Sequence, residues 1–489
     1  MQESLTIDEK LEPDKKDVID EGVEAGLSRL TPQKISQVIN QVLTKETGPR
    51  FKAYVETCMR CGLCADACNI FLSNDRDPKF SPAAKVKQTI LEMIKRKGKV
   101  SKQFLKDTVR IAHTECNACK RCSMYCPFGI DIAYMMLQVR RICHKLEITP
   151  LYIQDTVNSH SATMNQMWVK EDEWIDTLQW QEEDAREEFE NLRIPLDKDG
   201  ADIMYSVIAP EPKFQAGLIY QTAVIMHAAG LNWTMPSTPG WDNSNMAMYT
   251  GDFEISARIA QVHYETAAKL HVKKIVMGEC GHAFRSVYDV GNRWVGWAMP
   301  PVDLVHAIDF YHDMLTSGKI RVKEKYKKTV TLHDPCNISR GRGLHNKARE
   351  LVNILCESFI EMTPNREHNY CCGAGGGVIN CGPPWKGTRM VNSREKKDQI
   401  ERTGAEVLIA PCHNCHSGLE DIVEHYGVDM EIKFFGDIIY EVMEKTIYQE
   451  KKIKWKGDYD ETKTIHIYNY RHLDDNSILF LLPGRISNG

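Results

Sequence analysis

Two groups of four cysteines in the first third of the chain constrain its fold more than any other feature. Each group has the spacing Cys-x-x-Cys-x-x-Cys-x-x-x-Cys, and the eight residues are Cys58, Cys61, Cys64, Cys68, Cys116, Cys119, Cys122 and Cys126. Three thiolates spaced in this way surround one face of a [4Fe–4S] cubane, and the fourth reaches across to a second cluster. The spacing therefore predicts two cubane [4Fe–4S] clusters, with the ligand sets Cys58, Cys61, Cys64, Cys126 and Cys116, Cys119, Cys122, Cys68.

Zinc is the alternative for paired Cys-x-x-Cys motifs, since four thiolates form a tetrahedral zinc site. A zinc site does not require a third cysteine two residues after the second, nor the same x-x-x-Cys ending in both groups. The spacing therefore favours iron–sulfur clusters. Asn69 follows the first group where Pro127 follows the second, which changes a turn but removes no ligand. No open iron position is indicated, so both cubanes are expected to transfer electrons.

The composition excludes several other classes of protein. A chain of 489 residues with 17 cysteines is too long for a small secreted disulfide scaffold. The formal net charge of −5 gives no bias toward nucleic acid, and no nucleic-acid partner is expected. Segment 1–16 lacks the basic and apolar regions of a secretion signal. Segment 216–231 is too short and too polar to span a membrane, so we expect it to form a core helix.

Composition and hydrophobic pattern divide the chain into six segments. We expect a disordered acidic leader over 1–30, a helical domain with the two cubanes over 31–149, an acidic helical connector over 150–200, one α/β domain over 201–325, a second over 326–445, and a C-terminal tail over 446–489. The apolar run 478–482 in the tail is too short to cross a bilayer. The connector places Trp168, Trp174, Leu178 and Phe189 on roughly one helix face, which favours a cover for the next domain over an acidic docking surface.

The two α/β domains repeat one pattern, in which a cysteine follows a strand and precedes a helix. A strand over 274–277 leads to Cys280, and a strand over 405–410 leads to Cys412. Ligands collect at such strand ends in α/β units. The predicted fold class is therefore α+β and α/β multidomain, with a mostly helical, ferredoxin-like two-cluster domain followed by two tandem α/β domains.

A third set of cysteines lies in the second α/β domain, and its members are Cys336, Cys371, Cys372, Cys412 and Cys415. Five cysteines from three loops can hold a larger or open iron–sulfur assembly, and Gly373 and Gly375 would let the backbone approach it closely. Gly373-Ala-Gly375 also resembles the start of a dinucleotide-binding loop, but Val378 replaces its last glycine. Scattered buried cysteines or a simple zinc site would also account for this set.

The order Cys336, Cys371-Cys372-Gly373, Cys412-x-x-Cys415 resembles the CCG motif of heterodisulfide reductase catalytic subunits. Together with the two quartets, the resemblance covers roughly residues 50–445 and extends to heterodisulfide reductase D-like and DsrK-like iron–sulfur subunits of membrane-bound redox complexes. It implies that the tandem α/β domains are CCG-type domains. It also implies one noncubane [4Fe–4S] cluster that reduces or forms a disulfide, held by Cys336, Cys371, Cys372, Cys412 and Cys415.

The resemblance is incomplete in the first α/β domain, where residues 240–242 stand near the position of the cysteine pair. Only Cys280 remains of that motif, and Ala283 stands at the second position of Cys-x-x-Cys. This implies one noncubane site and one degenerate site. Cys280 and His282 are then candidate catalytic residues near the domain interface, where they would shape the substrate cleft.

The resemblance also implies partners and a location. The electron partner would be an integral-membrane cytochrome b-type or quinone-interacting subunit, together with other subunits of the complex. The chain would then be cytoplasmic and peripheral on the inner face of the membrane. The substrate would be a small disulfide or a small cysteine-bearing protein of anaerobic sulfur metabolism.

The implied reaction exchanges a disulfide, two electrons and two protons for two thiols, while each cubane carries one electron at a time. The reduction potentials decide its direction, since ~30 mV shifts this balance by about 1.4 kcal/mol. Histidines beside the motif cysteines are candidate proton donors or structural residues, and they are His282, His333, His413 and His416. Arginines that could attract a carboxylate or remain solvated are Arg285, Arg340 and Arg342. Cysteines without a motif are expected to be packing residues, and they are Cys143, Cys356 and Cys381.

Two further functions stay open from the sequence. The resemblance extends to electron-transfer subunits of glycolate and glycerol-3-phosphate dehydrogenase complexes, in which the chemistry occurs on a separate flavin subunit. A simpler electron relay would bind zinc at the third cysteine set. Metal content distinguishes the relay from both enzymes, and reactivity with disulfides distinguishes the enzymes from each other.

Overall fold

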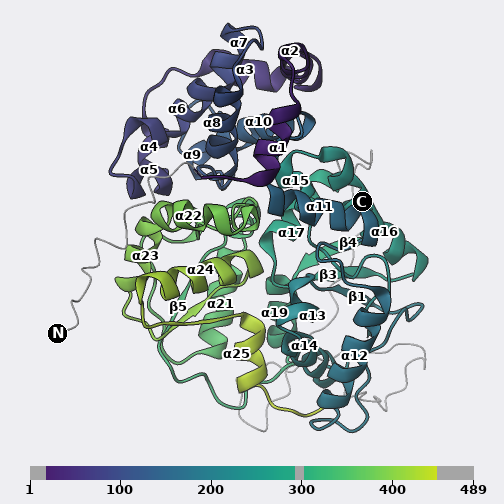
Figure 1. The fold of residues 1–489 in the computed structure, drawn as a ribbon. Helices are drawn as coiled ribbons and strands as arrows, with labels where there is room; N and C mark the ends of the chain where they lie inside the picture. The colour runs from purple at the N-terminus through teal and green to yellow at the C-terminus, as the bar shows by residue number, and fades with distance from the viewer. Residues whose placement is uncertain (1–17, 292–301, 449–489) are drawn as a thin grey trace, which may run out of the picture.

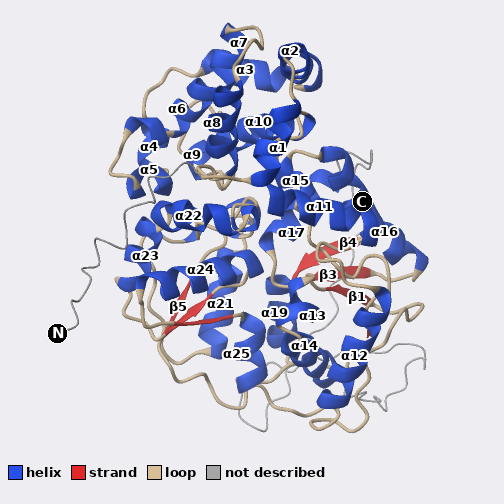
Figure 2. Ribbon diagram, viewed as in Figure 1, coloured by secondary structure: helices blue, strands red, loops and turns tan. Residues whose placement is uncertain are grey.

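The computed structural model describes residues 18–291 and 302–448, which form a helical domain beside two α/β domains (Figure 1). Within these residues every strand belongs to one of the two α/β domains, so the predicted fold class is confirmed (Figure 2). The predictions for residues 1–17 of the leader and for 449–489, including the apolar run 478–482, lie outside the described residues. No helix within 18–291 and 302–448 has the length and hydropathy of a membrane span.

The helical domain contains the helix start that the sequence predicts. Thr31 caps α2 by accepting a hydrogen bond from the Lys34 amide at 3.2 Å, and Pro32 occupies the first turn. The α-helices of this domain are α1 (Glu21–Arg29), α2 (Pro32–Gln41), α3 (Pro49–Thr57), α4 (Leu63–Asp66), α5 (Asn69–Ser73), α6 (Pro82–Val86), α7 (Glu92–Lys95), α8 (Lys102–His113), α9 (Arg121–Met124) and α10 (Ile132–Lys145).

The predicted disordered leader is wrong for residues 18–30, which contain α1. The Asp20 carboxylate caps this helix by accepting from the Val23 amide at 3.2 Å, and it also accepts from the Leu151 amide and from Trp385 Nε1, both at 3.0 Å. Val23 and Leu27 lie one turn apart and are both buried. The acidic composition indicated disorder, whereas these few apolar residues at helical spacing are sufficient to bury one face.

Segment 150–200 forms two helices, α11 (Leu151–Thr163) and α12 (Glu171–Ala185), and α12 packs on α14 of the first α/β domain. Trp174 and Leu178 are buried, and Trp174 stacks on Trp241 with ring centroids 4.5 Å apart. Trp168 lies between the two helices and is 47% exposed, so its predicted place on the buried face is wrong. The prediction of one continuous helix face is wrong here because the chain changes direction between α11 and α12.

The first α/β domain has a parallel sheet in the order β2-β1-β3-β4. Its strands are β1 (Ile203–Ser206), β2 (Trp233–Thr234), β3 (Lys274–Met277) and β4 (Asp303–His306). Its helices are α13 (Pro210–Phe214), α14 (Gly217–Ala228), α15 (Ala247–Thr250), α16 (Phe253–Lys269), α17 (Gly281–Ser286) and α19 (Ala307–Thr316). The largely buried α14 is the core helix expected over 216–231.

The second α/β domain has a smaller parallel sheet in the order β5-β6-β7. Its strands are β5 (Val330–Leu332), β6 (Val407–Ile409) and β7 (Glu431–Lys433). Its helices are α20 (Ser339–Arg342), α21 (His345–Leu355), α22 (Lys386–Asn392), α23 (Arg394–Glu401), α24 (His413–Tyr426) and α25 (Phe435–Val442). The predicted repeat is present, because Cys280 caps α17 after β3 and Cys412 caps α24 after β6.

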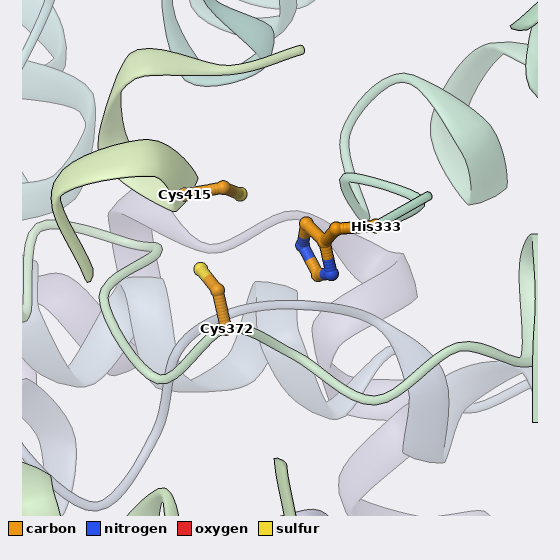
Figure 3. Close-up of side chains that lie close together, drawn as sticks. All are labelled: His333, Cys372 and Cys415. Atoms are coloured by element: carbon orange, nitrogen blue, oxygen red, sulfur yellow. The ribbon is translucent and has the colours of Figure 1, made fainter. Parts of the chain in front are cut away.

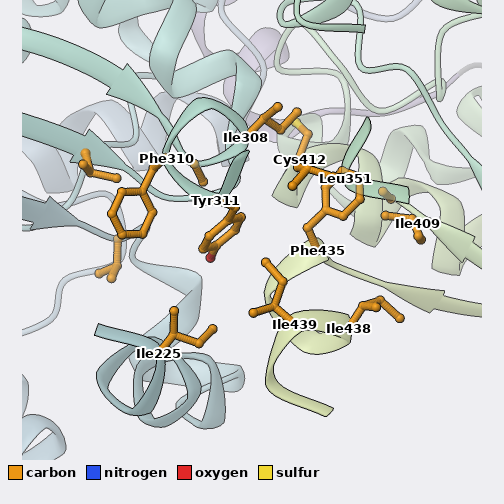
Figure 4. Packing of buried hydrophobic residues seen from close by; sticks show 14 of the residues in the cluster. Ile225, Ile308, Phe310, Tyr311, Leu351, Ile409, Cys412, Phe435, Ile438 and Ile439 are labelled. Atoms are coloured by element: carbon orange, nitrogen blue, oxygen red, sulfur yellow. The ribbon is translucent and has the colours of Figure 1, made fainter. Parts of the chain in front are cut away.

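One hydrophobic core runs through both α/β domains. Ile225 of α14 and Tyr311 of α19 face Phe435 and Ile439 of α25, and Cys412 lies at the edge of the same cluster (Figure 4). The strand ends that carry cysteines are therefore held by packing that both domains share.

Candidate iron–sulfur centres

Cys58, Cys61, Cys64 and Cys126 line one cavity of the helical domain. Cys61 is exposed, and Cys64 is buried. Burial raises the pKa of Cys64 to about 11, and the neighbouring thiolates Cys58, Cys61 and Cys126 act in the same direction. The four cysteines that the spacing assigns to one cubane thus lie together.

The cysteines assigned to the other cubane also lie together. Burial raises the pKa of Cys122, and the thiolates Cys119, Cys68 and Cys116 raise it further. Lys85 is 2% exposed and places its Nζ 3.9 Å from Cys68 Sγ. A buried cation beside several thiols fits a centre that carries negative charge.

The backbone of both quartets has the same unusual conformation on either side of the second cysteine. Arg60 and Gly62 have φ values of 55° and 85°, and Ala118 and Lys120 have values of 47° and 64°. A non-glycine residue in this region costs ~1 kcal/mol and persists only where its surroundings hold it. The repeated left-handed turns wrap each loop around its own thiols, which fits residues that enclose a cluster.

The third set of thiols forms one continuous series at the ends of β5 and β6. Hydrogen-bonding contacts join Cys336 to Cys371, Cys371 to Cys372, Cys372 to Cys415, and Cys415 to Cys412. All are buried except Cys336, which is partly exposed. The structure thus brings together all five cysteines that the resemblance assigns to the noncubane cluster.

His333 points toward this series, and its ring nitrogen lies with the sulfurs of Cys372 and Cys415 within 4.8 Å of one another (Figure 3). These three side chains could hold a single metal ion, and they are the only such group in the described part of the chain. A zinc ion uses four ligands. Because the thiol series continues on both sides of this group, the donor set fits a larger iron–sulfur assembly better than one zinc ion.

The second quartet touches the third set directly. A hydrogen bond with Cys371 lowers the pKa of Cys119 to about 5, and the charges of Arg340 and Arg121 act in the same direction. Arg340 also holds this loop, because its Nη1 donates to the Cys119 carbonyl at 2.8 Å. No spacing in the sequence indicated this contact, since it joins segments that lie 252 positions apart, at Cys119 and Cys371.

The glycine run after Cys372 packs mainly against the second quartet. Asn117 Nδ2 donates to the carbonyls of Gly373 and Gly375 at 2.7 and 3.2 Å. A Cβ on Gly373 would lie 1.9 Å from Ser393 Oγ, whereas one on Gly375 would lie 3.8 Å from Cys371 Sγ. Gly375 therefore lies beside a motif cysteine as predicted, but the close approach at Gly373 is to a serine side chain.

Cys280 and His282 of the first α/β domain lie at the same centre. Cys280 contacts Cys412, its Sγ is 2.9 Å from His282 Nδ1, and the Gly281 amide donates to Cys412 Sγ at 3.3 Å. Burial lowers the pKa of His282 to about 4. Cys280 therefore extends the thiol series of the third set, which is a closer association than a place near the domain interface.

The place of the missing cysteine pair in the first α/β domain is filled by a packed polar network. Asp242 accepts from the Gln166 amide at 2.7 Å and from the Ala209 amide at 3.1 Å, and it lies 3.3 Å from His160 Nε2. Trp241 stacks on Trp174. This network leaves Cys280 as the contribution of the first α/β domain to the thiol series.

The four histidines beside the motifs differ in their contacts. His413 Nε2 lies 3.0 Å from Glu211 Oε1, and the His416 ring stacks on Phe434 with centroids 4.1 Å apart. His282 and His333 instead lie against cysteines. The structure therefore favours His282 and His333 among the proton-donor candidates by position.

Buried cations also lie near the thiols, and the sequence did not reveal them. Lys396 Nζ donates to Gln399 Oε1 at 2.6 Å and to Asn369 Oδ1 at 3.2 Å, and burial lowers its pKa to about 8. Arg140 donates to the carbonyls of Cys116 at 2.6 Å and Tyr249 at 2.8 Å. Lys396 lies in a run of charged residues that reads as a solvated helix face, so no pattern distinguished it.

Comparison with known proteins supports both cluster regions. A 4Fe-4S dicluster domain matches residues 54–130, and a cysteine-rich domain of the CCG family matches residues 330–420. The chain is 24% identical over 470 residues to an Hdr-like menaquinol oxidoreductase iron-sulfur subunit 2 from Archaeoglobus fulgidus, covering 83% of each chain. It is 26% identical over 401 residues to the D subunit of a dihydromethanophenazine:CoB–CoM heterodisulfide reductase from Methanosarcina barkeri, covering 80% of this chain and 94% of the relative. The chain thus carries a cubane dicluster region and a CCG cluster region.

Proposed function

We propose that this chain, a heterodisulfide reductase D-like iron–sulfur protein, is an oxidoreductase subunit that interconverts one disulfide and two thiols. The two cubanes would carry electrons to or from a noncubane [4Fe–4S] cluster at the third cysteine set. The contact between Cys119 and Cys371 carries this proposal, because it joins the predicted electron path to the predicted reaction centre. The relatives from Archaeoglobus and Methanosarcina support this function over the dehydrogenase-type alternative.

The three cysteine sets would supply the ligands. Cys58, Cys61, Cys64 and Cys126 would hold the outer cubane, Cys116, Cys119, Cys122 and Cys68 the inner cubane, and Cys336, Cys371, Cys372, Cys412 and Cys415 the noncubane cluster. When bound, the noncubane cluster supplies two-electron disulfide chemistry from one-electron donors. The buried cations Lys85 and Lys396 would offset the negative charge of the thiolate ligands.

The proposed reaction is R–S–S–R′ + 2e⁻ + 2H⁺ ⇌ RSH + R′SH. In the reductive direction the S–S bond breaks, the partner protein would supply both electrons, and each sulfur takes one proton. His282 and His333 lie beside the cysteines, and burial lowers the pKa of both, so each would be neutral near pH 7 and could accept a thiol proton in the oxidative direction. Cys280 would act as a positioning thiol, since it contacts Cys412 without belonging to the motif.

We place the electron partner at the outer cubane. Large apolar side chains surround the exposed Cys61 there, with Met59 70%, Leu63 53% and Phe128 47% exposed. Such a patch is typical of a protein-binding surface. Because relatives are named for menaquinol and dihydromethanophenazine, the proposed partner is a quinone-interacting or cytochrome b-type membrane subunit, which would hold the chain at the cytoplasmic face. The proposed substrate is a small disulfide or a cysteine of a small protein.

Metal analysis and electron paramagnetic resonance (EPR) spectroscopy test this function. The chain is purified without oxygen, its iron and zinc are counted, and spectra are recorded after mild oxidation with and without a thiol. About twelve irons per chain and a signal that changes with thiol are expected. About eight irons with one zinc, and no thiol-sensitive signal, would leave an electron relay and refute the proposed reaction.

A further inference from the structure

A cleft opens where the helical domain meets the first α/β domain. Its volume is about 560 Å³, and its lining includes Tyr54 and Tyr134 from the helical domain and Met248 and Phe253 from the α/β domain. This volume suits a small molecule or the end of a peptide chain. A smaller recess adjoins the cleft and shares Lys120, Arg285 and Asp289 with it.

The recess leads to the two sulfurs at which the cluster regions meet. Cys119 and Cys336 both line it, together with Asn337 and Gly341. Cys336 is the one member of the third set that is not buried, and Cys280 is buried as well. Among the described residues, the recess is therefore the place where a disulfide from solvent would reach the third set.

The lining of the recess is basic. It contains Lys120, Arg285 and Arg342 but a single carboxylate, Asp289. Arg285 is 6% exposed, and its Nη1 donates to the Ala118 carbonyl and to Asn337 Oδ1, both at 3.0 Å. Its Nε is buried without a hydrogen-bond partner in the described structure, apart from Asp289 at 3.8 Å. A buried guanidinium with an unused donor is suited to an anionic group.

Arg342 is held as a second anion-binding group. Its guanidinium lies 3.6 Å from the centroid of the Tyr288 ring, and its Nη2 donates to Asp289 Oδ1 at 2.7 Å. Arg121 and Arg340 donate to backbone carbonyls of the cysteine loops, so their guanidinium groups stabilise these loops. The guanidinium of Arg342 instead lines the recess itself, where its charge can act on a bound anion.

We infer that the cleft and recess bind a disulfide or thiol with a carboxylate a few bonds from its sulfur, with that carboxylate on Arg285 and Arg342 and the sulfur at Cys336. The inference rests on the proposed function and narrows its substrate class. The carboxylate can come from a free small molecule or from the end of a protein chain with a cysteine near its C-terminus. The reaction balance is unchanged, because the carboxylate only positions the disulfide.

Binding tests the inference without turnover. Isothermal titration calorimetry with the oxidised, iron-loaded chain compares the redox-inert dianion thiodipropionate with the neutral thiodiethanol. We expect the dianion to bind at least about tenfold more tightly, Arg342→Gln to weaken it about tenfold, and Asp289→Asn to strengthen it. Arg394→Gln is the matched control, because Arg394 pairs with Asp75 outside the cleft. Equal affinities for both probes, or an affinity that Arg342→Gln and Asp289→Asn leave unchanged, would overturn the inference.

Turnover measurements distinguish a failure of this inference from a failure of the proposed function. With reduced viologen as the one-electron donor, two viologen radicals and two protons reduce one disulfide to two thiols. We expect kcat/KM to fall from dithiodipropionate to bis(hydroxyethyl) disulfide to cystamine, and Arg342→Glu to reverse that order. Equal reduction of all three by both forms would refute the carboxylate site and leave the function, whereas no reduction and no thiol-dependent EPR change would refute the function itself. The source of the carboxylate is tested with a peptide that has a disulfide beside its C-terminal carboxylate, and with the C-terminal amide of the same peptide as its control. A kcat/KM higher for the carboxylate peptide than for dithiodipropionate indicates the end of a protein chain, and the reverse order indicates a free small molecule.

Discussion

Gly376 is the position at which the loop of the third cysteine set presses most closely on the second quartet. Its φ is 65°, and a Cβ built there would lie 2.3 Å from the Asn117 carbonyl oxygen and 2.6 Å from its carbon. Its own carbonyl accepts a hydrogen bond from the buried Arg140. The obstacle is backbone, so a side chain cannot be accommodated by turning a neighbouring rotamer. Gly376→Ala must therefore move one loop away from the other.

The loss of folding free energy in Gly376→Ala has a conformational part and a packing part, and substitutions of two other glycines measure these parts separately. A left-handed alanine costs ~1 kcal/mol, and overpacking against a fixed backbone adds ~1–3 kcal/mol, so the sum is ~2–4 kcal/mol. Gly404 has φ 60° with open space around its Cβ position, so Gly404→Ala should cost only the first ~1 kcal/mol. Gly387 lies in α22 with open space and no left-handed φ, so Gly387→Ala should stabilise by ~0.5 kcal/mol.

Two measurements on the iron-loaded variants test this order. Thermal unfolding at one fixed scan rate should rank Gly376→Ala below Gly404→Ala, with Gly387→Ala at or above the parent chain. Stopped-flow reduction should show slower electron arrival at the third cluster in Gly376→Ala alone, because the Cys119–Cys371 contact lies beside this loop. A Gly376→Ala variant that matches Gly404→Ala in both measurements would refute the argument that this packing holds the electron path.

Three further predictions concern metal content, a buried ion pair and pH. Cys415→Ala should lower the iron content from about twelve to about eight per chain, while Cys356→Ala, which has no motif partner, should leave it unchanged by elemental analysis. Arg349 donates to both oxygens of the buried Asp334 at 2.9 and 2.8 Å, so Arg349→Met should destabilise by ~3–5 kcal/mol in thermal unfolding, and adding Asp334→Asn should restore part of it. Burial lowers the pKa of His263 to about 4, so the unfolded chain binds the extra proton between about pH 6.5 and 4, and stability falls as the pH falls through this window. His263→Gln should remove up to ~1.4 kcal/mol per pH unit of that loss, and an unchanged pH dependence of unfolding would contradict the assignment.

The sequence predicted the parts of this molecule that follow from local spacing. The quartets, the helix start at Thr31, the strand before Cys280 and the strand before Cys412 all depend on residues that are neighbours in the chain. The acidic composition of the leader led to a wrong prediction, because an average over the segment hides the two buried residues of α1, Val23 and Leu27. Asp20 caps this helix and also binds Trp385.

The parts that the sequence did not predict are tertiary contacts between distant segments. The sequence around Lys396 is typical of an exposed helix face, yet the fold buries this side chain. Nothing in the sequence near Asn117 indicates that its amide donates to the glycine loop. Gly373 illustrates the same limit, since the need for glycine was foreseen but the neighbour, Ser393, was not. Spacing indicates which thiols can share a cluster, whereas only packing decides which clusters touch.

The packing also separates the route of electrons from the route of the proposed substrate. The cavity of the outer quartet and the recess at Cys336 share no lining residue, and the exposed Cys61 belongs only to the first. A partner docked at Met59 and Leu63 would therefore leave the recess open. The inner quartet stands between the two routes, with Cys122 near Cys64 on one side and Cys119 against Cys371 on the other. Cys119 and Cys336 both line the recess, so a disulfide there would lie where the inner quartet meets the third set. Electrons from a partner docked near Cys61 would therefore pass the inner quartet, one at a time, before they reach the disulfide.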